Sequence, residues 1–327
     1  MSKMLLMTHR ADNDGLTPVI LASFVFQDFD VALLEPNELD TYIQEQQEAF
    51  ADYDTIFITD LCPTEKAIEF LEPYASKIQV LDHHHSNLAM NQYSFIKVVD
   101  QDETGKKQCG TTLFYQYLKQ NYPCEEFNKK SVSQFVELVR GLDTWDWKKD
   151  NNLDAVKLGD LFTIYGRDYY VAYYKEALKQ MEAFQFTEKE EHLLQIEELR
   201  KNRYMIEKEE EIYEVYCSGK KFGVVFAEQH RSFLGNQLCE RHPEYDFFAI
   251  INVSKTISYR SIGEEDVSLF AKQFGGGGHV NASGSSLPNH FLETVVQTIY
   301  PEAEVIGGEI HEFQLSEKWL FKNTDFK

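Results

Sequence analysis

The chain has 327 residues, enough at about 150 residues per domain for two domains that each bury a core. Its composition, 43% hydrophobic and 26% charged, excludes a disordered, collagenous or coiled-coil protein. Asp and Glu number 54 against 32 Lys and Arg, so the formal net charge is −22 and a protein that coats long duplex nucleic acid is not expected. A small anionic ligand remains compatible with this charge, because a local metal site can outweigh a distant negative field.

The cellular location is predicted from the N-terminus, from hydropathy and from the cysteines. The segment MSKMLLMTHRADND does not resemble a signal peptide, and no stretch reaches the ~18 apolar residues that span a membrane. Five cysteines without a C-x-x-C pair are typical of reduced thiols. We therefore expect a cytoplasmic protein with no membrane partner, while the oligomeric state stays open.

The first half of the chain alternates short apolar runs with segments of helical spacing. The runs are Met4–Met7, Val31–Leu34, Ile56–Ile58, Ile78–Leu81 and Phe95–Val99, and helical segments such as Pro18–Phe26 and Thr64–Lys77 lie between them. This order predicts an α/β domain built on a mostly parallel sheet. Ligands of such sheets bind beyond the carboxyl ends of the strands, so polar residues that directly follow a strand carry most weight.

Helical spacing dominates the chain from residue 111 onward, and a second domain is predicted near its end. Helices are expected over Thr111–Leu118, Ser131–Arg140, Leu153–Leu178 and the charge-dense Thr187–Tyr213. Strands are expected over Lys221–Ala227, Phe247–Val253 and Thr256–Ser261, with a helix over Val267–Phe274 that runs into GGGGH. We predict a catalytic domain over 1–185, a helical linker over 186–214 and a smaller α/β domain over 215–327.

Four acidic or histidine clusters follow predicted elements of the first domain. They are His9, Asp12 and Asp14 in THRADNDG; Asp60 in FITDL; Asp82, His83, His84 and His85 in VLDHHHSN; and Asp143 in GLDTWDW. Taken singly, each has an ordinary structural explanation as a helix cap, a turn or a hydrogen-bonded histidine. Together, carboxylates that converge with imidazoles at one sheet edge would repel one another unless cations compensated them.

The mixture of donors indicates which cations fit. Imidazole and carboxylate ligands suit Mn²⁺, Zn²⁺ or Fe²⁺ better than Ca²⁺, and there are enough of them for two ions. Two ions ~4 Å apart activate water and neutralise an in-line phosphoryl displacement. The sequence therefore predicts hydrolysis of a phosphate ester or anhydride.

A glycine-rich segment in the second domain is a candidate for binding an anion. Gly275–His279 lies at a predicted helix exit and precedes VNASG. Glycine allows positive φ angles and a close approach of backbone amides to an anion, although a glycine run alone more often marks a flexible loop. Arg260 and Ser261 on the preceding strand strengthen the prediction of a phosphate or nucleobase pocket.

The ordered motifs resemble the DHH phosphoesterase superfamily with a DHHA1 domain. The resemblance rests on Asp12 and Asp14, on Asp60, on Asp82-His83-His84, on Asp143 and on GGGGHVNASG, in that order. Within the superfamily the chain is similar to the nanoRNases and oligoribonucleases, phosphodiesterases that act on short oligonucleotides, linear dinucleotides or bisphosphorylated adenosine.

The resemblance implies a role for each matching residue. His9, Asp12 and Asp60 would hold one Mn²⁺, and Asp14, Asp60, His83 and Asp143 would hold the other, with Asp60 bridging. His84 would contact the scissile phosphate, and the second domain would bind the far side of the substrate through Arg260, Ser261, Gly276, Gly277, Gly278 and His279. Many members have three residues between the first His and the first Asp, whereas only Arg10 and Ala11 separate them here. His9 could therefore be a ligand or lie behind the ligands.

Three functions are compatible with these residues. The first is a Mn²⁺-dependent phosphodiesterase that releases 5′-mononucleotides from very short RNA or linear dinucleotides, a class of substrate that needs few basic contacts. The second keeps the metal site but acts as a phosphatase on a bisphosphorylated nucleotide, pyrophosphate or polyphosphate. The third is a catalytically silent nucleotide-binding sensor, which would bind its ligand without turnover.

Overall fold

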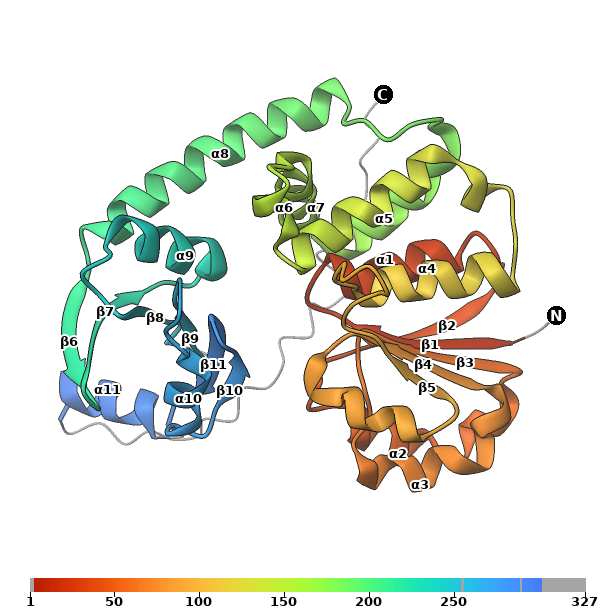
Figure 1. The fold of residues 1–327 in the computed structure, drawn as a ribbon, viewed down its shortest axis with the longest axis horizontal. Coiled ribbons are helices and arrows are strands. Elements are labelled where there is room, and N and C mark those ends of the chain that lie inside the picture. The colour runs from red at the N-terminus through yellow and green to blue at the C-terminus, as the bar shows by residue number, and fades with distance from the viewer. Residues whose placement is uncertain (1–2, 254–255, 289, 302–327) are drawn as a thin grey trace. The chain divides into compact units, whose positions relative to one another are not determined.

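We describe the protein from a computed structural model, which covers residues 3–253, 256–288 and 290–301. The chain divides into two compact units, Met1–Glu198 and Leu199–Lys327 (Figure 1). The helix α8 (Glu188–Glu209), which matches most of the helix expected over 187–213, crosses this division.

A five-stranded parallel sheet organises the first unit. Its strands are β1 (Met4–His9), β2 (Phe29–Leu34), β3 (Thr55–Thr59), β4 (Ile78–Asp82) and β5 (Ile96–Val98), in the order β2-β1-β3-β4-β5. All four pairs of neighbouring strands in this sheet are parallel. The predicted parallel α/β sheet is thereby confirmed.

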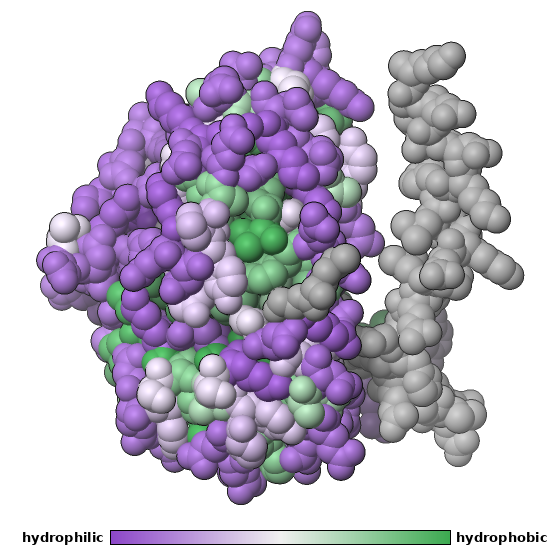
Figure 2. All heavy atoms as spheres, turned by 90° about the vertical axis from the view of Figure 1, so that its right-hand side faces the viewer, coloured by the Kyte–Doolittle hydropathy of each residue, from purple (hydrophilic) through white to green (hydrophobic). Residues whose placement is uncertain are grey.

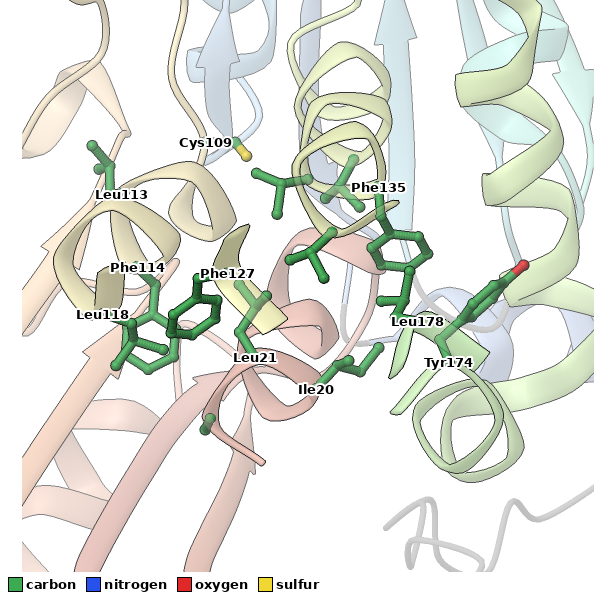
Figure 3. Packing of buried hydrophobic residues seen from close by; sticks show 14 of the residues in the cluster. Ile20, Leu21, Cys109, Leu113, Phe114, Leu118, Phe127, Phe135, Tyr174 and Leu178 are labelled. Carbon is green, nitrogen blue, oxygen red and sulfur yellow. The ribbon is translucent and has the colours of Figure 1, made fainter. Parts of the chain in front are cut away.

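Helices cover both faces of this sheet, because its central strands are apolar on both sides. They are α1 (Asn13–Ala22), α2 (Leu39–Gln46), α3 (Glu65–Leu71), α4 (Gly110–Asn121), α5 (Lys130–Asp143), α6 (Asp146–Lys149) and α7 (Leu153–Gln180), with 3₁₀ turns at Ala49–Asp52, Glu72–Lys77, His85–Gln92 and Glu126–Asn128. Leu6 and Phe57 pack with α1, α4, α5 and α7, in the core drawn in Figure 3. Leu5 and Ile58 face the opposite way and pack with α2 and α3.

The register brings the carboxyl ends of neighbouring strands to one edge. His9 pairs with Leu34, and Thr8 pairs with Thr59, which in turn pairs with Leu81. Polar residues that follow β1, β2, β3 and β4 therefore emerge side by side, which is where the sequence places its acidic and histidine clusters.

Helix α1 begins earlier than the sequence suggested. We expected helical structure over 18–26, whereas α1 starts at Asn13 with Asp12 as its N-cap. The Asp12 carboxylate accepts a hydrogen bond from the Gly15 amide at 2.9 Å, and such a cap satisfies a free amide of the first turn. The D-x-D-G motif is therefore the start of a helix.

The second unit is built on a mixed six-stranded sheet. Its strands are β6 (Tyr213–Cys217), β7 (Lys220–Phe226), β8 (Phe247–Ile251), β9 (Thr256–Arg260), β10 (Gly277–His279) and β11 (Ala282–Ser286), in the order β10-β11-β9-β8-β7-β6. Its helices are α9 (Arg231–Arg241), α10 (Val267–Lys272) and α11 (Phe291–Ile299), in addition to the end of α8. Phe248 and Ile250 pack with α9, whereas Phe247 and Tyr259 on the other face pack with α10.

The glycine-rich segment differs from its predicted form. We expected a loop at a helix exit, but Gly277–His279 forms the edge strand β10, paired antiparallel with β11. A side chain at position 276 would place Cβ only 2.0 Å from the carbonyl oxygen of Gly284. Close approach to β11 accounts for a glycine there, because any Cβ would collide with the neighbouring strand.

One face of the molecule is mostly hydrophilic. Hydrophilic side chains cover most of the face shown in Figure 2, although a patch of hydrophobic residues is exposed near its middle. Among the described residues, none of the helices combines the length and the apolar character needed to cross a bilayer.

Candidate metal centre

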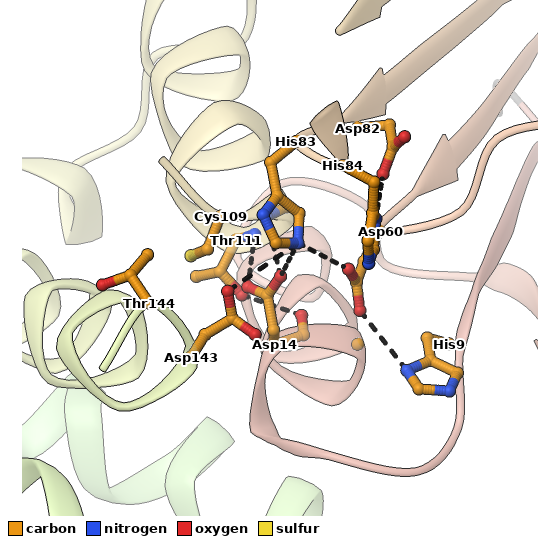
Figure 4. A network of polar contacts seen from close by, with 12 residues as sticks. His9, Asp14, Asp60, Asp82, His83, His84, Cys109, Thr111, Asp143 and Thr144 are labelled. Carbon is orange, nitrogen blue, oxygen red and sulfur yellow. Dashed lines mark hydrogen bonds and ion pairs between the residues drawn. The ribbon is translucent and has the colours of Figure 1, made fainter. Parts of the chain in front are cut away.

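The acidic and histidine clusters meet at the carboxyl edge of the parallel sheet (Figure 4). His9 ends β1, Asp60 follows β3, and Asp82 ends β4 just before His83 and His84. Asp14 lies in the first turn of α1, and Asp143 is the last residue of α5. The structure thus brings together residues that are up to 134 positions apart in the chain, from His9 to Asp143.

Asp60 is the central carboxylate of this cluster. Its Oδ1 atom lies 3.1 Å from Nε2 of His83, and its Oδ2 atom lies 3.5 Å from Nδ1 of His9. The backbone of Asp60 has a φ of 56°, a left-handed conformation that non-glycine residues rarely adopt and that is often found at functional sites. One oxygen of Asp60 therefore faces each of the two imidazoles.

Two groups of donor atoms surround Asp60. His9, Asp12 and Asp60 form one, in which Nδ1 of His9 lies 3.1 Å from Oδ2 of Asp12. Asp14, His83 and Asp143 form the other, with both carboxylates within 3.7 Å of Nε2 of His83. Within each group the donor atoms lie within 4.8 Å of one another. The first group has the same members as the first set that the family resemblance implied, and the second has those of the other set without Asp60. A further group of donors consists of Asp60, Asp82, His83 and His84.

The start of α4 fixes the buried Asp14 carboxylate. The amides of Gly110 and Thr111 donate hydrogen bonds of 2.7 and 2.8 Å to its two oxygens, and the Thr111 hydroxyl donates to the Asp14 carbonyl at 2.8 Å. An anion is stabilised at a helix N-terminus, where amides lack partners within the helix. Asp14 is thereby oriented by a segment 96 residues away in the chain.

Burial and crowding raise the proton affinity of two carboxylates. Burial, together with the neighbouring Asp60 carboxylate, raises the pKa of Asp14 to about 7. Burial and the Asp14 carboxylate likewise raise the pKa of Asp143 well above its ordinary value. Burial would also raise the pKa of Asp60, but hydrogen bonds with His83 and His9 lower it below the usual range.

The two imidazoles respond to the same crowding. Burial alone would lower the pKa of His9, but hydrogen bonds with Asp12 and Asp60 raise it to about 11. Burial would also lower the pKa of His83, but the hydrogen bond with Asp60 raises it to about 11. Protons thus supply positive charge among these carboxylates when no other cation does.

The chemistry of the donor set fits divalent cations. Three carboxylates, from Asp14, Asp60 and Asp143, converge on one imidazole, which carries at most one positive charge. A cation would relieve their repulsion, and nitrogen and oxygen donors together suit Mn²⁺, Zn²⁺ or Fe²⁺. Residues at these positions could therefore hold metal ions.

His84 lies beside the cluster and is held by other residues. Its Nδ1 atom is 2.8 Å from Oδ1 of the fully buried Asp82, whose Oδ2 accepts a hydrogen bond of 2.8 Å from Asn87. Burial would lower the pKa of His84, but the Asp82 carboxylate raises it. Nδ1 of His85 contacts Oδ2 of Asp100 at 2.7 Å.

The substrate-binding residues expected in the second domain lie in the second unit. Arg260 pairs in register with Ala282, which pairs with His279. Directly paired residues of antiparallel strands place their side chains on the same face, so Arg260 and His279 share one face of this sheet. Arg260 donates to the Ser232 hydroxyl at 2.7 Å, while its buried Nε has no hydrogen-bond partner among the described residues.

Ser261 and the glycines have structural explanations inside the same unit. The buried Ser261 hydroxyl donates to the Glu265 carbonyl at 2.7 Å and accepts from Asn281 at 3.0 Å. Gly278 has a φ of 136°, which side chains rarely tolerate, and Gly277 has open space where a Cβ would lie. Arg260 and His279 are the residues of the predicted set whose side chains can carry a positive charge and so attract an anion.

Sequence reasoning missed several residues that shape the cluster. Glu35 contacts His9, and the amides of Gly110 and Thr111 hold Asp14. Only Glu35 carried a usable signal, because it directly follows β2 at the same sheet edge. Gly110 and Thr111 begin a helix that follows a loop, and the sequence does not indicate where that helix points.

Comparison with known proteins places the chain in a family. No family model matches it. The chain is 33% identical over 294 residues to the oligoribonuclease NrnB of Bacillus subtilis (strain 168), a match that covers 87% of this chain and 73% of that protein. The chain belongs to the NrnB family. The predicted resemblance to DHH oligoribonucleases and the prediction of a hydrolase acting on phosphoric ester bonds are thereby confirmed.

Two further matches are more distant. A 3′,5′-cyclic-nucleotide phosphodiesterase of Helicobacter pylori (strain ATCC 700392 / 26695) is 23% identical over 245 residues, which cover 64% of this chain and 68% of that protein. The solved DHH domain of a member of the s1p family of ribosomal proteins has a TM-score of 0.57 and 15% identity, and covers 91% of this chain and 86% of that one. That structural likeness supports the DHH fold.

Proposed function

We propose that the protein is a Mn²⁺-dependent phosphodiesterase that hydrolyses short oligonucleotides or linear dinucleotides to 5′-mononucleotides. The observation that carries the proposal is Asp60, whose two oxygens face His83 and His9 in two adjacent donor groups. The oligoribonuclease activity in the name of its Bacillus relative supports the substrate class.

Each donor group would hold one ion. His9, Asp12 and Asp60 would bind the first, and Asp14, Asp60, His83 and Asp143 would bind the second. When bound, such a pair of divalent ions makes water a better nucleophile near neutral pH and offsets the charge that develops on the phosphoryl oxygens. The helix amides on Asp14 hold that ligand in place before any ion arrives.

His84 would contact the scissile phosphate. Its Nδ1 faces Asp82, so a protonated ring has Nε2–H left to donate to a phosphoryl oxygen. The Asp82 carboxylate raises the pKa of His84 and so favours that protonated form. Asn87 secures the other oxygen of Asp82 and so keeps the carboxylate turned toward the ring.

The second unit would bind the part of the substrate beyond the scissile bond. Arg260 supplies a partly buried guanidinium, and His279 lies on the same face of the sheet two strands away. Arginine binds phosphate well because its planar donors match the oxygens of the anion. A short substrate fits a chain with a net charge of −22, since a long strand would need an extended basic surface.

A substrate panel tests this function. A diribonucleotide, a five-mer, a ten-mer, bisphosphorylated adenosine and pyrophosphate are incubated with the full chain and Mn²⁺, and the products are separated by ion-pair chromatography. We expect mononucleotides from the diribonucleotide, at a rate that falls as the substrate lengthens. Release of inorganic phosphate alone would replace the proposal with a phosphatase, and binding without turnover would replace it with a sensor.

A further inference from the structure

Glu35 lies at the carboxyl edge of the parallel sheet, beside the candidate metal centre, but its carboxylate belongs to neither donor group. It follows β2 directly, and β2 lies beside β1 with Leu34 in register with His9. The Arg10 amide donates to the Leu34 carbonyl at 3.2 Å, which ties the two strand ends together. This pairing places Glu35 next to the side chain of His9.

Glu35 contacts the side of the His9 ring that faces away from the metal ligands. Its Oε2 atom lies 3.3 Å from Nε2 of His9, whereas Nδ1 of the same ring faces Asp12 at 3.1 Å and Asp60 at 3.5 Å. The His9 side chain is only 18% exposed, so the ring has little room to turn. The two ring nitrogens therefore meet different partners.

The Glu35 carboxylate is itself fixed on several sides. Its Oε1 accepts from Nε of Arg10 at 3.0 Å, and Arg10 also reaches Glu38 at 2.9 Å. The Glu35 amide donates to the Glu38 carboxylate at 2.8 Å, which closes the turn at the start of α2. Such contacts hold Oε2 of Glu35 in one place relative to the ring.

This arrangement has a chemical consequence for a neutral histidine. When a neutral imidazole donates its Nε2–H to a carboxylate, the free lone pair of the ring is on Nδ1. The nitrogen with the free lone pair is the one that can bind a cation. Residues behind metal-binding histidines commonly fix the tautomer in this way, and their loss weakens metal binding by about 10- to 100-fold. Glu35 is in this position relative to His9, although only two residues separate His9 from Asp12.

We propose that Glu35 is a positioning residue that holds His9 with Nδ1 directed toward the first metal site. The inference rests on the proposed function, because it takes His9, Asp12 and Asp60 as ligands. It assigns Arg10 and Glu38 the role of holding Glu35, and so makes the turn between β2 and α2 part of the metal centre.

Mn²⁺ titrations of the full chain, followed by electron paramagnetic resonance without substrate, test the proposal. We expect two ions in the wild type, and in Glu35→Ala one site weakened about 10- to 100-fold with the other unchanged. Glu35→Gln keeps an oxygen for the Nε2–H group and should lose less than about tenfold. The matched control is Glu45→Ala, an exposed residue of α2, which should titrate like the wild type.

Two comparisons make the result decisive. Because Arg10 only helps to hold Glu35, Arg10→Ala should weaken the same metal site less than Glu35→Ala does, and a greater loss in Arg10→Ala than in Glu35→Ala overturns the proposal. Nitrogen NMR of labelled histidine in the Cd²⁺-loaded protein should show His9 bound through Nδ1 in the wild type and a mixture of ring forms in Glu35→Ala.

The remaining outcomes separate this inference from the proposed function. Two unchanged sites in Glu35→Ala overturn the positioning role and leave the phosphodiesterase standing. Loss of one site in Glu35→Ala, in a protein whose wild type cleaves no dinucleotide, supports the positioning role and removes the substrate assignment. A wild type that binds no Mn²⁺ overturns both.

Discussion

Gly110 packs directly against Asp60, so closely that a Cβ atom at position 110 would lie 2.7 Å from the Cβ of Asp60. The amide of the same glycine donates to Asp14. The first residue of α4 thus lies against an aspartate from each donor group.

Replacing Gly110 with Ala should therefore damage the metal centre. Gly→Ala in a helix usually stabilises a protein by about 0.4–1 kcal/mol, but here the new methyl group must displace Asp60 or α4. We expect weaker Mn²⁺ binding and a lower melting temperature. Gly141→Ala in α5 is the matched control, because its Cβ would meet nothing closer than 3.8 Å. Equal Mn²⁺ affinity in the two variants would show that the metal centre tolerates a methyl group at position 110.

Replacing Asp60 with Ala should abolish turnover, because both proposed ions lose a shared ligand. We expect kcat to fall by at least about 10³-fold on a dinucleotide, and Mn²⁺ binding to weaken at both sites. Steady-state kinetics and a metal titration measure the two effects. Near-native activity in this variant would mean that the ligand assignment is wrong.

Replacing Asp82 with Asn should slow the reaction without removing metal. The carboxamide keeps the shape of the side chain but no longer favours a protonated His84 ring. We expect kcat to fall about 10- to 100-fold while Mn²⁺ affinity stays at the wild-type value. A loss of metal in Asp82→Asn would instead assign this carboxylate to the ligand set.

Replacing His279 with Ala should chiefly weaken substrate binding. His279 lies in the second unit on the face that carries Arg260, and it belongs to neither donor group. We expect KM to rise by about tenfold with kcat little changed. This pattern is expected when the lost contact binds the substrate and the transition state equally well. The neighbouring exposed Val280→Ala serves as the control, and an unchanged KM in His279→Ala would remove this residue from the substrate site.

The metal-free protein should lose stability as the pH rises from about 4 to about 7. The pKa of Asp14 lies near 7 in the folded chain against an ordinary 3.8, so the folded state holds this proton more tightly and is favoured most at low pH. The raised pKa values of His9 and His83 extend the decline toward alkaline pH. Urea unfolding at several pH values with a chelator present measures the slope.

Two additions check the origin of this slope. Asp14→Asn removes the titrating group and should flatten the decline between pH 4 and 7. Mn²⁺ should reverse it, because metal binding displaces the protons and therefore strengthens as the pH rises. If the chelated wild type is as stable at pH 7 as at pH 4.5, protons are not what compensates these carboxylates.

The sequence by itself determined the parallel sheet and the residues at its carboxyl edge. Apolar runs such as Met4–Met7 and Ile78–Leu81 are followed at once by His9 and by Asp82-His83, and a parallel sheet must bring such strand ends to one side. The same local pattern predicted most of α8, since a long amphipathic spacing needs no information from elsewhere in the chain.

Only the tertiary structure decided which atoms meet. That the amides of α4 hold Asp14, that Glu35 lies behind His9 and that Asp143 reaches His83 depends on how helices pack on the sheet. The glycine-rich segment shows the same limit, because Gly277–His279 becomes a strand only through pairing with β11. Hydrogen bonds between distant segments leave no periodic pattern in the sequence, so they become visible only once the elements have packed.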